Sequence, residues 1–175
     1  RHDGCSTESV EEAEVIAREV DRMLGTVWTN QQGETRPLEA ADIMVVAPYN
    51  DQVNLIGRTL FDRGLGDVPV GTVDRFQGQE AAVVFYTMTA SSTADAPRGV
   101  GFLFSQNRLN VAISRARCLA FLVSTPNLFN VKAGSVSTMR LVANLCAFRV
   151  EANVAISPAG VRAAGRDQSP SVRHG

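Results

Sequence analysis

The sequence predicts an α/β fold in which a mostly parallel sheet is covered by helices on both faces. Short apolar runs alternate along the chain with segments whose apolar residues recur at intervals of three and four, which is the periodicity of a helix. The apolar runs show little polar alternation, and such strands are typical of parallel sheets that are buried on both sides. Strands that alternate with helices favour this architecture.

The first elements follow from this pattern. An amphipathic helix is predicted over 8–24, with Ser9 and Glu12 as a capping box near its start. Residues 26–42 contain glycine and proline and are predicted to form a polar connection or a small hairpin. We expect Trp28, within this segment, to be a packing residue rather than a platform for a nucleic-acid base.

The later elements suit one domain over 1–150. In chain order they are a strand at 43–47, a helix at 51–63, strands at 68–73 and 82–88, a helix at 107–116, a strand at 118–124 and a helix at 136–148. A loop is expected at 89–101. Residues 151–175 lose the periodicity and are predicted to be a flexible tail.

The composition is that of an ordinary globular protein, with 45% hydrophobic and 20% charged residues among 175. No apolar run is long enough to cross a membrane and no signal pattern begins the chain, so we expect a cytoplasmic protein. Cys5, Cys118 and Cys146 lie far apart with no histidine nearby, which indicates neither a metal site nor a disulfide framework. Cys118 and Cys146 are predicted to be buried.

The net charge of −1 hides a strong asymmetry. The first 95 residues hold seven arginines against sixteen acidic residues, whereas the stretch between Asp95 and Glu151 contains seven basic residues and no acidic one. This polarity can build a positive field suited to a polyphosphate or a nucleic-acid backbone. Pairing of these arginines with acidic residues of the first half is the alternative.

The only lysine, Lys132, does not follow the glycine-rich turn of a phosphate-binding P-loop, G-x-x-x-x-G-K-[ST]. The chain is therefore predicted not to be an ATPase that works without another domain.

Three polar clusters adjoin the predicted strands. They are PYNDQ at 48–52, TVDRFQGQE at 72–80 and RLNVAISRAR at 108–117. Ligands of open parallel sheets bind outside the carboxyl ends of the strands, and we expect all three clusters there. In the third cluster an apolar stripe of the predicted helix leaves Arg108 and Arg115 on the opposite side, away from the core.

These clusters resemble motifs IV, V and VI of superfamily 1 helicases, in the same order, and specifically those of the Upf1-like and Dna2-like group. The resemblance covers roughly 43–124. It implies a RecA-like three-layer sandwich and identifies residues 1–150 as the second motor domain of an ATP-dependent helicase, a domain whose N-terminal part we expect to be truncated.

The resemblance also implies cofactors and partners. ATP with Mg²⁺ would bind between two motor domains, the metal being held mainly by the N-terminal RecA-like domain of the same polypeptide. Single-stranded nucleic acid would be the track, and we favour DNA over RNA. A fused RecB-like nuclease domain and 5′ to 3′ movement fit the same analogy.

Roles transfer residue by residue. Arg115 matches the arginine finger that reaches the γ-phosphate, and Glu80, Gln77 and Gly78 match the nucleotide-contacting part of motif V. Arg108 either contacts the nucleotide or positions Arg115 or Glu80. A surface salt bridge is the alternative for Arg115.

Five further residues match the positions that contact nucleic acid in the family. They are Thr72, Asp74, Pro48, Tyr49 and Asn50. Capping of the next helix by Asn50 or Asp51 is an equal alternative. Phe76 is expected to plug the core, and Arg75 and Gln79 to belong to a polar turn.

The sequence departs from the family in lacking the D-E-x-[AQ] and Q-Y-R motifs. Two other functions are therefore considered: a non-catalytic module that binds nucleic acid or protein with a helicase-like fold, and a free-standing hydrolase. Glu80 and Arg115 argue against the first, and the absence of an identifiable nucleophile and base argues against the second.

Overall fold

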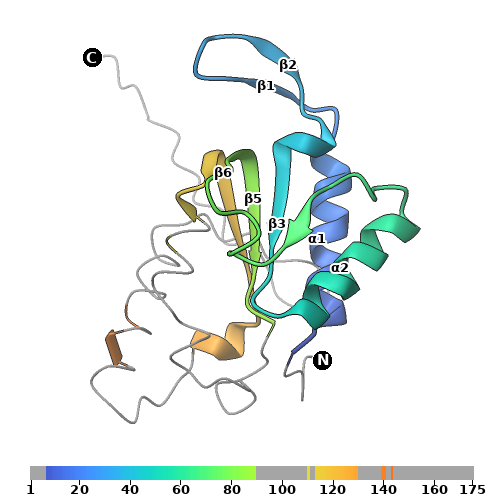
Figure 1. Cartoon of the computed structure of the whole chain (residues 1–175), viewed down its shortest axis with the longest axis vertical. Helices are drawn as coiled ribbons and strands as arrows, with labels where there is room; N and C mark the ends of the chain where they lie inside the picture. Colours follow the sequence, from blue (N-terminus) through green and yellow to red (C-terminus); the bar gives the residue numbers. More distant parts are fainter. Residues whose placement is uncertain (1–6, 90–109, 111–112, 130–138, 141–142, 144–175) are drawn as a thin grey trace, which may run out of the picture.

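A four-stranded parallel sheet forms the centre of the molecule (Figure 1). The computed structural model describes residues 7–89, 110, 113–129, 139–140 and 143. The sheet order is β4-β3-β5-β6, with β3 at Ile43–Val46, β4 at Val70–Gly71, β5 at Ala81–Thr87 and β6 at Ala116–Val123. The predicted α/β fold with a parallel sheet is confirmed and is that of a RecA-like domain.

Two helices, α1 (Val10–Met23) and α2 (Asn50–Asp62), pack against each other and against one face of this sheet (Figure 1). Their inward side chains meet alternate residues of the central strands. This core contains Ala13, Ile16, Ala17 and Val20 of α1, Ile56 and Leu60 of α2, and Ile43, Val45, Val83 and Phe85 of the sheet. Burial of these branched and aromatic side chains is the main force that holds the helices on the sheet.

The opposite face of the sheet is buried as well. Met44, Val46, Val84 and Tyr86 are all at most 3% exposed. The helices predicted at 107–116 and 136–148 lie mostly outside the described residues. The predicted loop at 89–101 lies outside them except for Thr89, and the predicted tail at 151–175 lies outside them entirely. Among the described residues, no helix is long and apolar enough to span a membrane.

The start of α1 is capped differently from the prediction. Ser9 is the N-cap, and its Oγ accepts a hydrogen bond from the Glu12 backbone at 3.2 Å, as expected. The Glu12 carboxylate instead accepts hydrogen bonds from the side chain of Thr87 and from the backbone of Met88 and Thr89, at the end of β5. The Ser9 amide is bound by Gln52 Oε1 at 2.6 Å. Half of the predicted capping box is therefore wrong, because Glu12 is drawn into the interior.

The predicted hairpin is present and projects beyond the sheet (Figure 1). Strands β1 (Val27–Thr29) and β2 (Thr35–Pro37) pair antiparallel. Arg36 joins the hairpin to η1 (Ala40–Asp42) through two hydrogen bonds of 2.6 Å to the carboxylate of Asp42. Its guanidinium also lies 5.3 Å from the centre of the Trp28 ring. Trp28 thus packs within the hairpin, as predicted.

Strand β6 departs from its predicted bounds and burial. It begins at Ala116, two residues early, and its first half is exposed because it forms the edge of the sheet within the described residues. Cys118 is exposed, so its predicted burial is wrong. A second short 3-10 helix, η2 (Pro126–Phe129), follows the strand.

The pairing of β5 with β6 contains a β-bulge. Ala81 lies opposite Ala116, but Val83 lies opposite Leu119, so β6 carries one extra residue there. Beyond the bulge Phe85 pairs with Phe121, and the two rings stack with centres 4.6 Å apart. The bulge therefore separates a regular apolar part of β6 from its exposed start.

Candidate functional site

The predicted site residues lie at two opposite edges of the sheet. Asn50 follows β3 and Thr72 follows β4, so both lie at the carboxyl edge, as predicted. Glu80 immediately precedes β5 and Arg115 immediately precedes β6, which places both at the amino edge. The expectation that all clusters gather at the carboxyl edge is wrong for these two residues. The physical reason is that each residue ends a connection between parallel strands. Such a connection must return to the amino edge before the next parallel strand can begin.

At the amino edge the backbone brings Arg115 next to the end of motif V. The amide of Ala81 donates to the carbonyl of Arg115 at 3.0 Å, and Arg115 Nη1 donates to the carbonyl of Gln79 at 3.1 Å. The side chain is half-buried, and among the described residues its Nε is buried without a hydrogen-bond partner. Arg115 lies in the turn before β6 and not inside the core. Arg108 lies outside the described residues.

Sequence reasoning missed Arg117, which pairs directly with Glu80. The distance from Arg117 Nε to Glu80 Oε2 is 3.1 Å, and both side chains are more than half exposed. Exposed ion pairs contribute little stability, so both groups can exchange this contact for a ligand at small cost. The signal was available: Arg117 is the last arginine of the third cluster, and the strand it begins runs beside the one that follows Glu80.

The turn that leads to Glu80 is built by backbone hydrogen bonds. The carbonyls of Thr72, Asp74 and Phe76 each accept from the residue three positions later. Gly78 has φ of +80°, a conformation that side chains with a Cβ rarely adopt, which explains the glycine of the motif.

Side chains of this turn divide into buried and exposed groups. Phe76 is 2% exposed and plugs the core, as predicted. Arg75 donates from Nη1 to the carbonyl of Val70 and braces the turn. Asp74 and Gln77 are exposed, and Thr72 is partly exposed.

The carboxyl edge offers less surface than the motif suggested. Pro48 is buried and Tyr49 is only 7% exposed, whereas Asn50 is exposed. Tyr49 is the N-cap of α2 without a side-chain cap hydrogen bond, and Asn50 is the first helical residue. The alternative that Asn50 or Asp51 caps this helix is therefore wrong.

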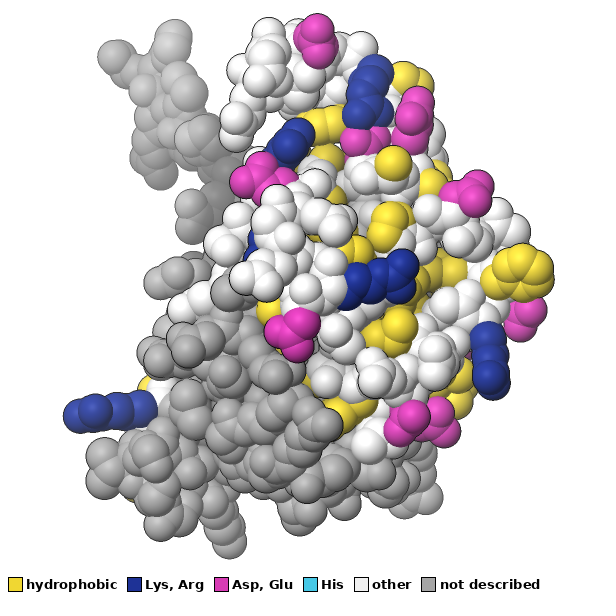
Figure 2. All heavy atoms as spheres, viewed as in Figure 1, with side chains coloured by type: hydrophobic (Ala, Val, Ile, Leu, Met, Phe, Trp, Pro, Cys, Tyr) yellow, Lys and Arg dark blue, Asp and Glu magenta, His cyan; other side chains and the backbone are white. Residues whose placement is uncertain are grey.

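The predicted charge asymmetry is only partly visible. Most of the basic stretch after Asp95 lies outside the described residues. On the face shown in Figure 2, basic and acidic side chains of the described residues are interspersed and do not form one basic patch.

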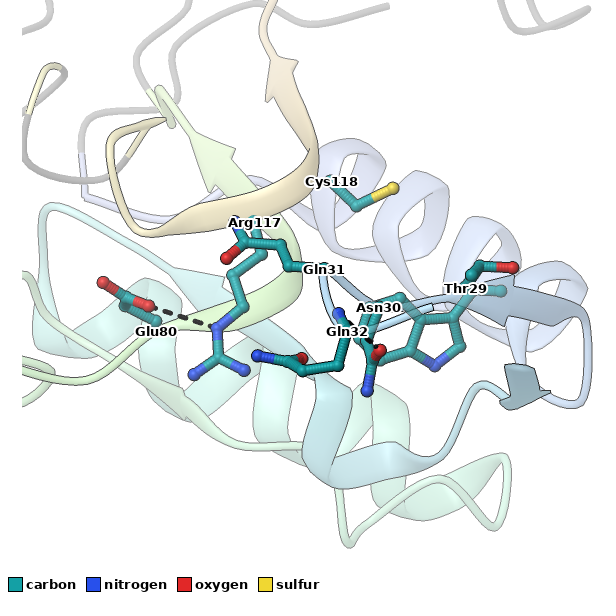
Figure 3. A pocket seen from close by; sticks show the side chains of 8 residues that line it. Thr29, Asn30, Gln31, Gln32, Glu80, Arg117 and Cys118 are labelled. Atoms are coloured by element: carbon teal, nitrogen blue, oxygen red, sulfur yellow. Dashed lines mark hydrogen bonds and ion pairs between the residues drawn. The ribbon is translucent and has the colours of Figure 1, made fainter. Parts of the chain in front are cut away.

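A cavity of about 220 Å³ adjoins the Glu80–Arg117 pair (Figure 3). Its opposite wall is the hairpin between β1 and β2. The lining residues are Trp28, Thr29, Asn30, Gln31, Gln32, Glu80, Arg117 and Cys118. The cavity thus combines one guanidinium group, one carboxylate and several amides, while Arg115 contacts Gln79, the residue before Glu80.

The chain is similar to several known proteins. Residues 1–127 match the family model described as "AAA domain". The chain is 45% identical over 80 residues to the DNA polymerase alpha-associated DNA helicase A of Schizosaccharomyces pombe, covering 46% of the chain. It is 37% identical over 93 residues to human RNA helicase Mov10l1, covering 51%, and 40% identical over 80 residues to rat DNA-binding protein SMUBP-2, covering 46%.

These alignments span 12%, 8% and 8% of the three relatives, respectively. The family model covers most of the chain, and two of these relatives are named helicases. The chain therefore belongs to the AAA domain family, among the superfamily 1 Upf1-like helicases.

Proposed function

We propose that this chain is the C-terminal motor domain of an ATP-dependent helicase or translocase and supplies the arginine finger, Arg115. The observation that carries the proposal is the position of Arg115. Its guanidinium is anchored to the carbonyl of Gln79, beside Glu80, at the amino edge of the sheet.

The groups at this edge fit one half of a nucleotide site. A guanidinium is a planar, permanently charged fork that suits phosphate oxygens, and a single anchoring hydrogen bond leaves most of its donors for a ligand. The exposed carboxylate of Glu80 suits sugar hydroxyls. ATP supplies the transferable phosphoryl group, and Mg²⁺ is held mainly by the N-terminal motor domain. Arg115 stabilises the negative charge that spreads over the phosphoryl oxygens.

Single-stranded nucleic acid is the proposed track, with DNA favoured over RNA. Two of the three relatives named above carry DNA in their names and one carries RNA. Asn50, Thr72 and Asp74 have surface available for such contacts. Pro48 and Tyr49 are buried and would act by shaping the loop that presents Asn50. A cytoplasmic location and a fused nuclease belong to the same proposal.

Replacement of Arg115 tests the finger role. In the full-length protein, Arg115→Ala is expected to lower the kcat of nucleic-acid-stimulated ATP hydrolysis by about 10³-fold or more, because an arginine finger contributes that much in other phosphoryl-transfer enzymes. Steady-state hydrolysis assays measure the loss, and fluorescence titration with a nucleotide analogue is expected to show that binding is largely retained.

Arg58→Ala is the matched control, since Arg58 is an exposed arginine on α2 and takes no part in the contacts of Arg115 and Glu80 described above. Full ATPase activity in Arg115→Ala would contradict the proposal and favour a non-catalytic binding module. An equal loss in the Arg58 control would also contradict it.

A further inference from the structure

A buried polar cluster joins three elements at the carboxyl edge of the sheet, where the starts of both helices lie beside the end of β5 (Figure 1). It consists of Ser9 and Glu12 at the start of α1, Gln52 in the first turn of α2, and Thr87 at the end of β5. Each of these residues is at most 3% exposed. Burial of polar side chains costs free energy unless their hydrogen bonds are made, so the geometry of this cluster must be specific.

Gln52 is the centre of the cluster. Its Oε1 accepts from the Ser9 amide at 2.6 Å, and its Nε2 donates to the Ser9 carbonyl and to Thr87 Oγ1, both at 3.3 Å. Both hydrogens of the amide group are therefore used. The Thr87 hydroxyl extends the connection, because it accepts from Gln52 and donates to the carboxylate of Glu12. A continuous chain of hydrogen bonds thus runs from α2 through the end of β5 to α1.

The first turn of α2 depends on this chain for its position. Tyr49, the N-cap, makes no side-chain cap hydrogen bond to the helix. Gln52 follows Asn50 by two residues, so the two side chains leave the helix on opposite sides: Gln52 is fully buried and Asn50 is exposed. The buried side chain therefore anchors the turn whose outer side carries Asn50, which is proposed to contact nucleic acid.

The same chain fixes the neighbouring turn, at the end of β5. Strands β3 and β5 are adjacent and parallel, with Val46 opposite Tyr86, so the residues that follow the two strands lie at one edge. There Glu12 accepts from the amides of Met88 and Thr89. A buried polar network whose hydrogen bonds are all made is rigid. The start of α2 and the end of β5 are therefore held as one unit.

We propose that Gln52 and Thr87 are positioning residues for the nucleic-acid track. Their buried hydrogen bonds hold the Asn50 turn against the end of β5 in the arrangement that binds a single strand. The inference rests on the proposed function, because Asn50 belongs to the track only under that proposal. Gln52 and Thr87 have no exposed surface with which to reach nucleic acid, so each acts through Asn50.

Thr87→Val in the full-length protein tests this role, since valine keeps the branched shape and the strand preference of threonine but lacks the hydroxyl. Gln52 then loses an acceptor and Glu12 loses a donor, so the Asn50 turn is held less firmly. We expect the Kd for a fluorescent single-stranded oligothymidylate, measured by anisotropy, to rise about 5-fold, the effect of one neutral hydrogen bond. Thr87→Ser retains the hydroxyl and should bind the oligonucleotide as the wild type does.

A double-mutant cycle separates positioning from stability. If Thr87 acts through Asn50, Thr87→Val should change the Kd little further in a protein that already carries Asn50→Ala. Additive effects of the two substitutions overturn the inference. Gln52→Met removes the three hydrogen bonds from the α2 side while keeping a long side chain, and it should raise the Kd at least as much as Thr87→Val.

Ile56→Val is the matched control for stability. Ile56 is buried in the same helix and lies outside the cluster, so the loss of one methylene group should lower the midpoint of urea unfolding without changing the Kd. An unchanged Kd in Thr87→Val overturns the inference. A rise of the same size in Thr87→Ser or in Ile56→Val also overturns it, because the effect would then be a general loss of stability.

The inference and the proposed function fail in different ways. Failure of the wild type to bind the oligonucleotide would contradict the track, and this inference with it. Binding by the wild type with an unchanged Kd in Thr87→Val would contradict the inference alone. Turnover of Arg115→Ala, measured in parallel, tests the finger role independently of both results.

Discussion

Glu12 is a buried carboxyl group that links the start of α1 to the end of β5. The side chain is 3% exposed, and its Oε2 accepts from Thr87 and from the amides of Met88 and Thr89. Thr89 itself has a φ of +68°, which is unusual for a residue with a branched side chain. The contact therefore holds the point at which the chain leaves the sheet towards motif VI.

Burial raises the pKa of Glu12 to about 7, although the hydrogen bonds from Thr87, Thr89 and Met88 oppose the shift. Because this pKa is higher in the folded than in the unfolded chain, the folded state binds more protons between about pH 4.5 and pH 7. The contribution of Glu12 to stability is therefore greatest below that window and declines as the pH rises through it.

Glu12→Gln should remove this pH dependence, since an amide oxygen can still accept the three hydrogen bonds. We compare the free energy of unfolding of the variant with that of the wild type at each pH. The difference between them is expected to increase in favour of the variant by about 3 kcal/mol from pH 4.5 to pH 7.5, because each unit of pKa shift corresponds to about 1.36 kcal/mol. Urea unfolding at a series of pH values measures the difference. Asp21→Asn, at an exposed carboxylate further along α1, is the control, and parallel pH profiles for wild type and Glu12→Gln would refute the burial argument.

At the scale of elements, β4 and the turn that follows it depend on a glycine for close packing. A Cβ on Gly71 would lie 3.1 Å from the ring of Phe76 and still closer to the side chain of Arg75. Phe76 is buried and cannot move away without opening the core. The strand that starts the path to Glu80 is therefore tightly fitted to its own turn.

Gly71→Ala is expected to destabilise the chain by about 1–3 kcal/mol, the usual cost of overpacking. The midpoint of urea unfolding measures this change. Gly57→Ala is the contrasting variant: Gly57 lies in α2 with open space around its Cβ position, so alanine should add up to about 1 kcal/mol of stability through helix propensity. Equal effects at the two positions would show that packing at Gly71 is not limiting.

The elements that sequence periodicity predicts best are those whose partners are local or uniformly apolar. Helices α1 and α2 and strand β5 lie within two residues of their predicted ends, and the hairpin was expected as one of two options. Strand β4 is shorter than predicted because the apolar residues around it, Val68 and Val73, are buried in loop and turn rather than in the sheet. Periodicity reports burial and cannot separate it from strand pairing.

The candidate site shows the same division. The motifs identified Glu80 and Arg115, and the chain does bring them to one edge. The sequence alone does not establish at which edge of the sheet Glu80 and Arg115 lie, because the edge depends on whether each cluster precedes or follows its neighbouring strand. Arg117 and the amides of the hairpin were missed since their relation to Glu80 is created only by the parallel pairing of β5 with β6 and the fold of the hairpin.

At the scale of the whole molecule, the proposed site is half of a shared one. The isolated 175-residue chain is therefore expected to hydrolyse no ATP and to bind nucleotide weakly, while the full-length protein turns over. Phosphate release assays on both proteins, with and without a single strand, measure this. Turnover by the isolated chain would show that it has a complete active site of its own.

The bulge between β5 and β6 carries a consequence for how this molecule tolerates change. If the same sequence were paired without a bulge, Phe85 would face Ala120 instead of Phe121 once Ala81 lies opposite Ala116. The bulge therefore lets the aromatic stack and the alignment of Arg115 with Glu80 exist together. Deleting the single residue at 118 would remove the bulge and leave both alignments in one regular ladder, whereas inserting another residue there would require a larger bulge to keep both.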